Sequence, residues 1–183
     1  MSDFLDVLAH DAKETVDSGY YQKLKPAASV YASLRKAILQ CKTNPVITEI
    51  KAASPSIGTI RRNFKPSEVA KAMEKGGAVG ISVLTEPKHF NGSLQALTEA
   101  RRAVKLPILM KDIILNPEQI EAASKIGADA ILLIEAVFER GYSKTGIDEM
   151  IAFAHAKGLE VLLETHTEEE FLSAAETGAD LIG

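Results

Sequence analysis

The fold is decided by the stretch Gly127-Ala128-Asp129-Ala130-Ile131-Leu132-Leu133-Ile134. A glycine at its start is typical of the end of a helix, and the apolar run after it is typical of a strand buried on both faces. The same junction recurs as Gly77-Ala78-Val79 and as Gly178-Ala179-Asp180. Each interval between junctions contains two strand–helix units, so one unit has about 25 residues, a sensible length for a βα unit.

Outward from this stretch, short apolar runs alternate with amphipathic segments. The runs predicted as strands are Val46–Lys51, Val79–Leu84, Ile108–Asp112, Ala130–Ile134, Glu160–Glu164 and Asp180–Gly183. The segments predicted as helices, from apolar residues at helical spacing, are Pro66–Lys75, Leu94–Val104, Pro117–Ile126, Ile147–Lys157 and Glu168–Thr177. Asn116 with Gln119, and Thr167 with Glu170, have the spacing of capping boxes at two of these helix starts.

This alternation predicts a parallel sheet with right-handed crossovers, which both a doubly wound sheet and a (βα)₈ barrel satisfy. A dinucleotide-binding doubly wound sheet carries a glycine-rich turn after its first strand, and Lys51–Gly58 is not such a turn. A barrel places its chemistry at the carboxyl ends of several strands, where this chain carries charged residues. We therefore predict an α/β fold, a parallel (βα) barrel of the TIM type.

Two regions are predicted along the chain. Residues 1–44 form an N-terminal helical extension, because apolar residues recur there at helical spacing in two segments. These residues are Phe4, Leu5, Val7, Leu8 and Ala12 in the first segment and Ala28, Val30, Tyr31, Leu34, Ala37, Ile38 and Leu39 in the second. Residues 45–183 supply strands one to six of the barrel, which is incomplete after strand six when compared with the ~250 residues of a whole TIM barrel.

Composition is ordinary for a soluble globular protein, with 46% hydrophobic and 25% charged residues. The 25 acidic and 21 basic residues give a net charge of −4, which favours neither nucleic acid nor a membrane surface as a partner. Cys41 is the only cysteine in the sequence and the four histidines lack metal-ligand spacing, so no metal site is expected. Since the N-terminus lacks a secretory pattern and no apolar run could span a membrane, we expect a cytoplasmic protein.

Four predicted strands carry ionisable residues at or near their carboxyl ends. Glu49 and Lys51 stand two residues apart on the first strand, and therefore on one face. Lys111, Glu135 and Glu164 stand at the ends of the third, fourth and fifth strands. Taken alone, each charged residue could equally mark the point where a strand leaves the core for solvent. Charged residues at the carboxyl ends of four strands together favour a shared site. Carboxylates and ammonium groups that converge there would suit general acid–base catalysis and the binding of an anionic substrate.

At these residues the chain resembles the indole-3-glycerol-phosphate synthase family. The segments that carry the resemblance are Glu49–Gly58, Ile81–Glu86, Phe90–Ser93, Pro107–Asp112, Gly127–Ile134 and Leu162–Glu164. They follow one another in the family's order and at family-like spacing from about residue 45 onward. The helical start resembles the family's N-terminal extension.

The resemblance implies a reaction and a phosphorylated small-molecule substrate. The substrate would be 1-(2-carboxyphenylamino)-1-deoxyribulose 5-phosphate. It cyclises and loses carbon dioxide and water to give indole-3-glycerol phosphate, a step of tryptophan biosynthesis, without a metal or organic cofactor. The implied enzyme is a carbon–carbon lyase of the carboxy-lyase type.

The resemblance also implies roles for particular residues. Lys111 matches the general acid that protonates the ketone oxygen as the ring closes. Lys51 matches a lysine that binds substrate anions and is a candidate acid for the dehydration, so which lysine serves which step stays open. Glu164 matches a catalytic carboxylate, and Glu49 a second one coupled to Lys51. The substrate-binding positions so implied are Lys51, Ser54, Pro55, Ser56, Phe90 and Leu132. Apart from the resemblance, the pair Arg61-Arg62 is a weaker candidate for a phosphate contact.

The chain departs from the family's pattern after Gly183, before the family's Asn-x-Arg of strand six and its segments of strands seven and eight. Those segments carry a catalytic glutamate and most of the phosphate site in the family, so we expect residues 1–183 alone to have little or no synthase activity. One alternative is a non-catalytic barrel fragment that acts only with a complementing piece. Another is a different phosphate-handling barrel such as phosphoribosylanthranilate isomerase. The open sheet edges also predict self-association.

Overall fold

A computed structural model of the chain describes residues 3–22, 24, 26, 32–60 and 63–183. Its main sheet has six parallel strands: β1 (Ile47–Ile50), β4 (Gly80–Leu84), β5 (Ile108–Lys111), β6 (Ala130–Ile134), β7 (Glu160–Glu164) and β8 (Leu181–Ile182). The predicted helical residues Ala28, Val30 and Tyr31, and the pair Arg61-Arg62, lie outside the described residues.

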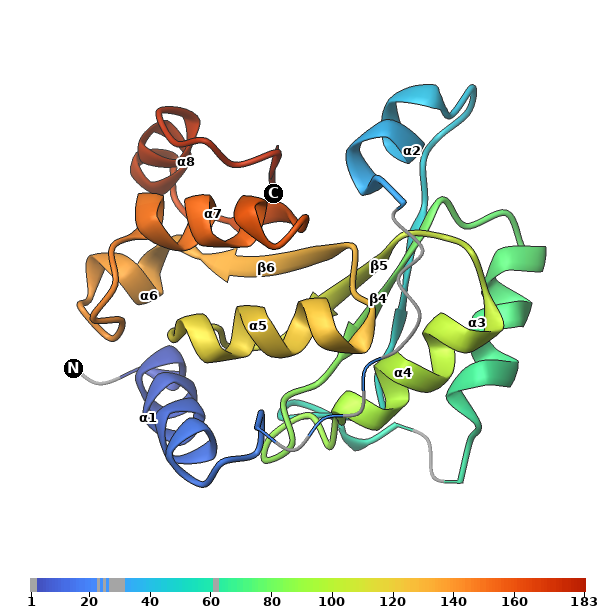
Figure 1. Cartoon of the computed structure of the whole chain (residues 1–183), viewed down its shortest axis with the longest axis horizontal. Coiled ribbons are helices and arrows are strands. Elements are labelled where there is room, and N and C mark those ends of the chain that lie inside the picture. Colours follow the sequence, from blue (N-terminus) through green and yellow to red (C-terminus); the bar gives the residue numbers. More distant parts are fainter. Residues whose placement is uncertain (1–2, 23, 25, 27–31, 61–62) are drawn as a thin grey trace.

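The strand order in the sheet is the order along the chain, β1-β4-β5-β6-β7-β8. A doubly wound sheet would reverse direction at a switch point, whereas a barrel adds each strand beside the previous one. The five predicted helices are present as α3 (Pro66–Lys75), α4 (Leu94–Ala103), α5 (Pro117–Ile126), α7 (Ile147–Ala156) and α8 (Glu168–Ala175) (Figure 1). The predicted fold class is therefore confirmed as an open (βα) barrel, in which β1 and β8 form the two edges of the described sheet.

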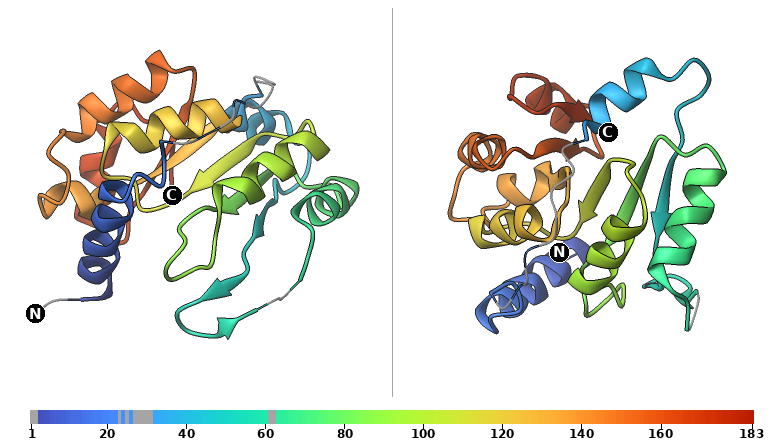
Figure 2. Two further views of the ribbon diagram at one scale, coloured as in Figure 1. Left: turned by 60° about the horizontal axis from the view of Figure 1, so that its bottom comes forward. Right: turned by 45° about the vertical axis from the view of Figure 1, so that its right-hand side comes forward.

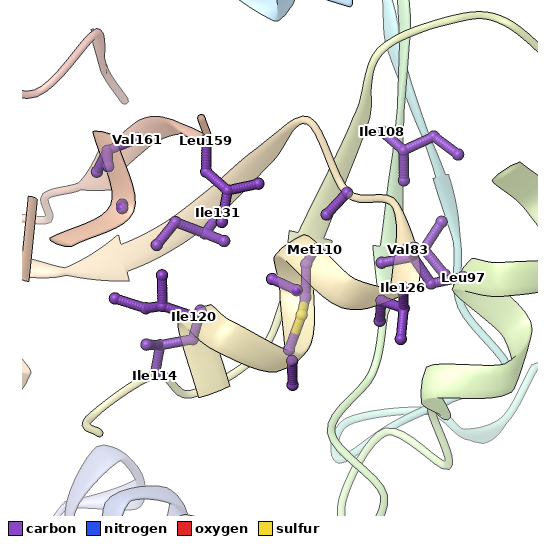
Figure 3. Close-up of a cluster of buried hydrophobic side chains, with 14 of the residues drawn as sticks. Val83, Leu97, Ile108, Met110, Ile114, Ile120, Ile126, Ile131, Leu159 and Val161 are labelled. Atoms are coloured by element: carbon purple, nitrogen blue, oxygen red, sulfur yellow. The ribbon is translucent and has the colours of Figure 1, made fainter. Parts of the chain in front are cut away.

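The main core lies between the outer face of the sheet and these helices (Figure 3). Alternate strand residues point outward, so Val83, Met110 and Ile131 meet Leu97 of α4 and Ile120 of α5 in one buried cluster. All five of these side chains are fully buried. This packing holds α3 against β1 and β4, and α4 against β4 and β5, and it leaves the opposite, concave face free for other contacts.

The concave face is covered by the N-terminal region. Helix α1 (Phe4–Asp17) lies at the carboxyl ends of the strands, whereas α2 (Leu34–Gln40) lies at their amino ends, as the views in Figures 1 and 2 agree. Leu8 of α1 and Leu34 of α2 join the concave-face cluster that contains Leu109 and Leu132. Gly80 permits the close approach of α2, since a Cβ atom there would lie 2.5 Å from the Cδ1 atom of Leu34.

The amino ends of the strands are fastened by a buried ion pair. The guanidinium Nη1 of Arg101 lies 2.7 Å from Oδ2 of Asp129, with both side chains almost fully buried. Asp129 also accepts hydrogen bonds from the backbone N–H groups of Ile108 and Ala32, each at 2.9 Å. Nη2 of Arg101 donates to the carbonyls of Val104 and Leu106 at 2.6 and 3.0 Å, whereas Nε of Arg101 has no hydrogen-bond partner among the described residues. Hydrogen bonds on both members thus offset part of the cost of burying the pair. It also ties the segment before α2 to β5 and β6.

Three local features differ from the sequence prediction. Helix α6 (Glu135–Glu139) follows β6 directly, and the hairpin β2 (Ala53–Ser54) with β3 (Gly58–Thr59) follows β1; neither was predicted. The capping box at Asn116 and Gln119 is present. At α8 the Thr167 hydroxyl caps the helix, but the Glu170 carboxylate accepts from the His166 N–H instead of from Thr167.

Candidate active site

Four of the five charged residues predicted to share a site, Glu49, Lys51, Lys111 and Glu164, point into the concave face near the carboxyl ends of the strands. The fifth, Glu135, instead begins α6, is buried, and accepts a hydrogen bond from the Ser173 hydroxyl at 2.7 Å. Glu49 stands opposite Ser82, Lys111 opposite Leu84, and Glu164 opposite Ile134 in the parallel ladders. Since side chains alternate along a strand, these positions share the face of Leu109 and Leu132, which belong to the concave-face cluster. Lys51 lies two residues beyond Glu49 and continues that face.

Lys111 and Glu164 form an ion pair across this face. Nζ of Lys111 lies 2.8 Å from Oε2 of Glu164, with side chains 31% and 27% exposed. The pair spans from β5 to β7, past β6 that lies between them. Nε2 of His166 lies 3.4 Å from the other carboxylate oxygen of Glu164. A half-buried ammonium group held in this way can donate a proton, and the adjacent carboxylate can accept one.

Glu49 and Lys51 form a second ion pair at the start of the sheet. Nζ of Lys51 lies 2.6 Å from Oε1 of Glu49, and the Ser82 hydroxyl donates to Oε2 of Glu49 at 3.3 Å. In the described part of the chain, no hydrogen bond or ion pair joins this pair to Lys111 or Glu164. The four residues thus share a face and an end of the sheet as two separate pairs.

A pocket of about 280 Å³ opens beside the Lys111–Glu164 pair. It is lined by Phe4, Leu5, Leu8, Leu84, Glu86, Phe90, Lys111, Asp112, Ile113, Leu132, Ile134, Glu164 and His166. Most of its wall is apolar, and α1 supplies one side of it. A pocket with apolar walls and a few charged groups is the usual form of a small-molecule site. Phe90 and Leu132, predicted to bind substrate, both line it.

The loop that carries Phe90 is held by the buried carboxylate of Glu86. This carboxylate accepts hydrogen bonds from the backbone N–H groups of Lys88, His89 and Phe90, at 2.8, 2.7 and 3.0 Å. Gly92 lies so close to the end of β4 that a Cβ atom there would come 2.5 Å from the Leu84 carbonyl oxygen. The aromatic ring therefore projects from a loop with few alternative conformations.

Ser54 ends β2, Pro55 and Ser56 lie in the turn that follows it, and none of the three lines the pocket. Ser54 is buried and its hydroxyl accepts from the Ile57 N–H at 3.3 Å, whereas Pro55 and Ser56 are exposed. The hairpin is nevertheless joined to the pocket loop, because the Ala53 N–H donates to the Phe90 carbonyl at 3.1 Å. Lys51 also stands outside the pocket lining.

Sequence reasoning missed Asp112, a buried acid at the pocket. Its Oδ2 atom accepts from the hydroxyls of Thr85 and Tyr21, at 2.5 and 3.1 Å, and its Oδ1 atom accepts from the Ile113 N–H at 2.8 Å. Burial raises the pKa of Asp112 to about 6, against the opposing effect of these hydrogen bonds. The only sequence feature that pointed to Asp112 was its position directly after Lys111. A single charged residue at the end of a strand does not show which face of the sheet its side chain occupies.

Within the described residues, no group of three or more His, Cys, Asp or Glu side chains is arranged to hold a metal ion. None of the helices that the structure describes is long and apolar enough to cross a membrane.

Comparison with known proteins places these features in a family. The family model described as "Indole-3-glycerol phosphate synthase" matches residues 6–183. A curated relative of that name from Methanocaldococcus jannaschii is 47% identical over 154 residues, which are 82% of this chain and 56% of the relative. Another from Thermococcus kodakarensis is 39% identical over 150 residues, 82% of this chain and 64% of the relative. The chain thus spans less than two thirds of the length of either relative.

A solved structure supports the fold alone. The N-acetylmannosamine-6-phosphate 2-epimerase from Clostridium perfringens superposes on 83% of this chain and 64% of its own, with a TM-score of 0.61 and 17% sequence identity.

Proposed function

Because this chain belongs to the indole-3-glycerol phosphate synthase family, we propose that it carries the proton-transfer part of a synthase site. The reaction is the ring closure of 1-(2-carboxyphenylamino)-1-deoxyribulose 5-phosphate to indole-3-glycerol phosphate, with loss of carbon dioxide and water. The observation that supports it most is the Lys111–Glu164 ion pair beside a pocket with the apolar walls that an aromatic ring needs.

In this proposal Lys111 is the general acid of ring closure. The ring carbon that bears the carboxylate attacks the ketone carbon, and the ammonium group of Lys111 gives a proton to the ketone oxygen. The C–C bond to the carboxylate then breaks, and its electron pair restores the aromatic ring as carbon dioxide leaves. The new hydroxyl then takes a proton from one of the two lysines and leaves as water, and the methylene carbon beside the nitrogen gives up a proton in return, which completes the indole. Glu164 contacts the Lys111 ammonium group at 2.8 Å and so fixes its direction before the transfer.

Phe90 and Leu132 are proposed to hold the anthranilate ring. Both line the pocket, and Phe90 is set in place by the loop that Glu86 organises. An aromatic ring packed between such walls is removed from solvent, and its reacting carbon is held in a fixed position. Ser54, Pro55 and Ser56 would border this end of the substrate from the hairpin, through the link between Ala53 and Phe90.

Lys51 is proposed to bind a substrate anion, with Glu49 as its carboxylate partner. The pair stands on the same concave face, outside the pocket lining, where a phosphate or carboxylate of an extended substrate could reach it. Which of the two lysines donates a proton in the dehydration is left open by this arrangement. Ammonium groups bind phosphate as compact point charges, which suits either role.

The test compares the chain alone with the chain completed by a second segment. Residues 1–183 are assayed for indole-3-glycerol phosphate by fluorescence, by themselves and fused to the part of the Methanocaldococcus jannaschii relative that follows its match to residue 183. We expect little or no product from the chain alone and clear turnover from the fusion. A fusion that folds cooperatively and makes no product would contradict the proposal.

A non-catalytic fragment is the second candidate, and the open edges of the sheet favour it for residues 1–183 alone. This candidate predicts activity only after assembly with a complementing piece. Because a non-catalytic fragment supplies none of the reacting groups, the activity of that assembly would not depend on Lys111. Assaying the fusion with and without Lys111→Ala separates the two candidates, because only the synthase proposal makes turnover depend on that residue.

A further inference from the structure

Lys111 and Asp112 are consecutive residues that point to opposite sides of the end of β5. Lys111 faces the pocket, whereas Asp112 is 2% exposed and meets Tyr21 and Thr85. Gln119 of α5 completes the group, since its Nε2 atom donates to the Tyr21 hydroxyl at 3.3 Å and to the Ile113 carbonyl at 2.8 Å. We refer to Asp112, Tyr21, Thr85 and Gln119 as the Asp112 cluster.

We propose that the Asp112 cluster is a positioning device that fixes the backbone of Lys111 and so aims its ammonium group into the pocket. The cluster joins four parts of the molecule: the segment after α1, the end of β4, the end of β5 and α5. Thr85 is the link to Lys111, because its backbone N–H donates to the Lys111 carbonyl at 3.0 Å while its hydroxyl donates to Asp112 at 2.5 Å. The peptide between Lys111 and Asp112 is thereby held from both sides.

A second tyrosine of the N-terminal region reinforces this link. The Tyr20 hydroxyl donates to the Thr85 carbonyl at 3.2 Å and accepts from the Leu94 N–H at 3.3 Å. The rings of Tyr20 and Tyr21 pack edge to face with their centroids 4.9 Å apart. Thr85 thus has its N–H, hydroxyl and carbonyl all engaged, and Gln119 holds the Tyr21 hydroxyl from the side of α5.

Stability alone is a poor explanation for the buried acid. A buried carboxylate is expensive unless it is paired with a cation, and apolar residues in its place are often neutral or stabilising. Among the described residues, the hydrogen-bond donors to Asp112 are two hydroxyls and one backbone N–H, none of them a cation. A carboxylate, unlike an apolar side chain, accepts hydrogen bonds at one point from Tyr21, from Thr85 and from the backbone of Ile113.

This inference rests on the proposed function, in which Lys111 acts on the substrate, and it predicts a positional effect. A displacement of about 1 Å in a reacting group can cost about 100-fold in rate. Tyr21→Phe keeps the ring and removes one hydroxyl, and Thr85→Val keeps the shape and removes the other. Each should displace Lys111 without touching the pocket.

The deciding measurement is made on the chain itself, residues 1–183. The lysine ε-CH₂ resonances are recorded by NMR with ¹³C-labelled lysine, and the Lys111 signal is assigned by its disappearance in Lys111→Arg. Tyr21→Phe and Thr85→Val should each shift or broaden this signal, since its contact with Glu164 changes. Tyr142→Phe is the matched control, because it removes a hydroxyl that bonds Asp6 outside the cluster. An unmoved Lys111 signal in both cluster variants, with the fold intact, would overturn the proposal.

Kinetics of the fusion described above give a second readout. We expect both variants to lower kcat about tenfold or more with KM little changed, measured well below the unfolding temperature. A cluster that only holds the fold together would lower the unfolding temperature and leave kcat as it was. If the unaltered fusion makes no product, the proposed function fails, but the NMR measurement still decides whether the cluster positions Lys111.

Discussion

Two neighbouring residues, Lys111 and Asp112, carry the proposed chemistry and the unusual electrostatics of this site. One is a half-buried cation paired with Glu164, and the other is a buried acid without a cationic partner among the described residues. The sequence predicted the first because a lysine at a strand end stands where barrel enzymes place their chemistry. It did not predict the second, because the cost of burying Asp112 depends on Tyr21, which is 91 positions away along the chain.

Replacing Lys111 should damage turnover far more than binding. Lys111→Ala in the fusion removes the proposed acid, and a positioned acid contributes roughly 10²–10⁴-fold in rate. KM should change little, since the apolar walls and Lys51 remain. Steady-state kinetics measure both constants, and Lys105→Ala, which removes an exposed lysine outside the pocket, is the control. A kcat in Lys111→Ala equal to that of the control would refute the acid role.

Asp112 should make the protein less stable as pH rises. Its pKa is raised by burial to about 6 from 3.8, so the folded state holds the proton more tightly than the unfolded state. Stability from this group is therefore full below about pH 4 and is lost as pH rises through about 6, by up to about 3 kcal/mol. Asp112→Asn does not titrate, so its unfolding free energy relative to wild type should improve across this interval.

Urea denaturation at several pH values measures this difference between wild type and Asp112→Asn. Glu86, Tyr21 and Tyr20 are titratable groups that interact with Asp112, and all three are retained in the variant, so the difference isolates Asp112. A difference in unfolding free energy that stays constant from about pH 4 to about pH 7 would show that Asp112 keeps an ordinary pKa.

At the scale of elements, the strands and helices of the barrel were predictable, whereas the short elements between them were not. Each predicted strand is present, because a short apolar run fits a strand of a parallel sheet that is buried on both faces. Helix α6 and the β2–β3 hairpin lack such a pattern, and their place is set by contacts distant in the chain, such as Ala53 with Phe90. Likewise the sequence predicted that α1 is a helix, but not that it covers the carboxyl ends of the strands.

Charged contacts hold α1 over the pocket. Asp11 of α1 lies 3.2 Å from Nζ of Lys88 and 2.6 Å from Nε2 of His89, in the loop that carries Phe90. Asp11→Asn weakens both contacts, and pairs of this kind near the surface each contribute little to stability. We expect amide hydrogen exchange in α1 to become up to about fivefold faster per pair lost, with the barrel strands unaffected.

Asp17→Asn is the matched control for this exchange experiment. It removes an exposed pair with Lys13 that lies wholly within α1, so it changes the helix and leaves the docking to the loop unchanged. Equal exchange rates in α1 for the two variants would mean that the contacts of Asp11 do not hold the helix in place.

At the scale of the whole molecule, the open sheet is the feature with the largest consequence. Strands β1 and β8 each have one side without a neighbouring strand in the described sheet. Large apolar side chains are exposed beside both edges, Val46 and Ile47 at β1 and Phe171 and Leu172 on α8 next to β8. Unpaired backbone groups flanked by apolar surface are the usual origin of edge-to-edge association.

Residues 1–183 alone should therefore self-associate through these edges. Pairing of the β8 edge of one copy with the β1 edge of the next would be head to tail, and such contacts do not close unless the rotation between copies permits a ring. We expect a mass that grows with concentration in sedimentation velocity, without one fixed stoichiometry.

A charge on an edge strand opposes pairing, so Ile47→Lys should lower the association at every concentration. Ile57→Lys adds the same charge at an exposed residue of the hairpin turn, outside both edge strands, and should associate as wild type does. Completion of the sheet in the fusion should likewise restore a single discrete mass, because the same edges are then paired within one chain. A wild-type chain that remains monomeric over the whole concentration range would show that the edges are protected by contacts other than strand pairing.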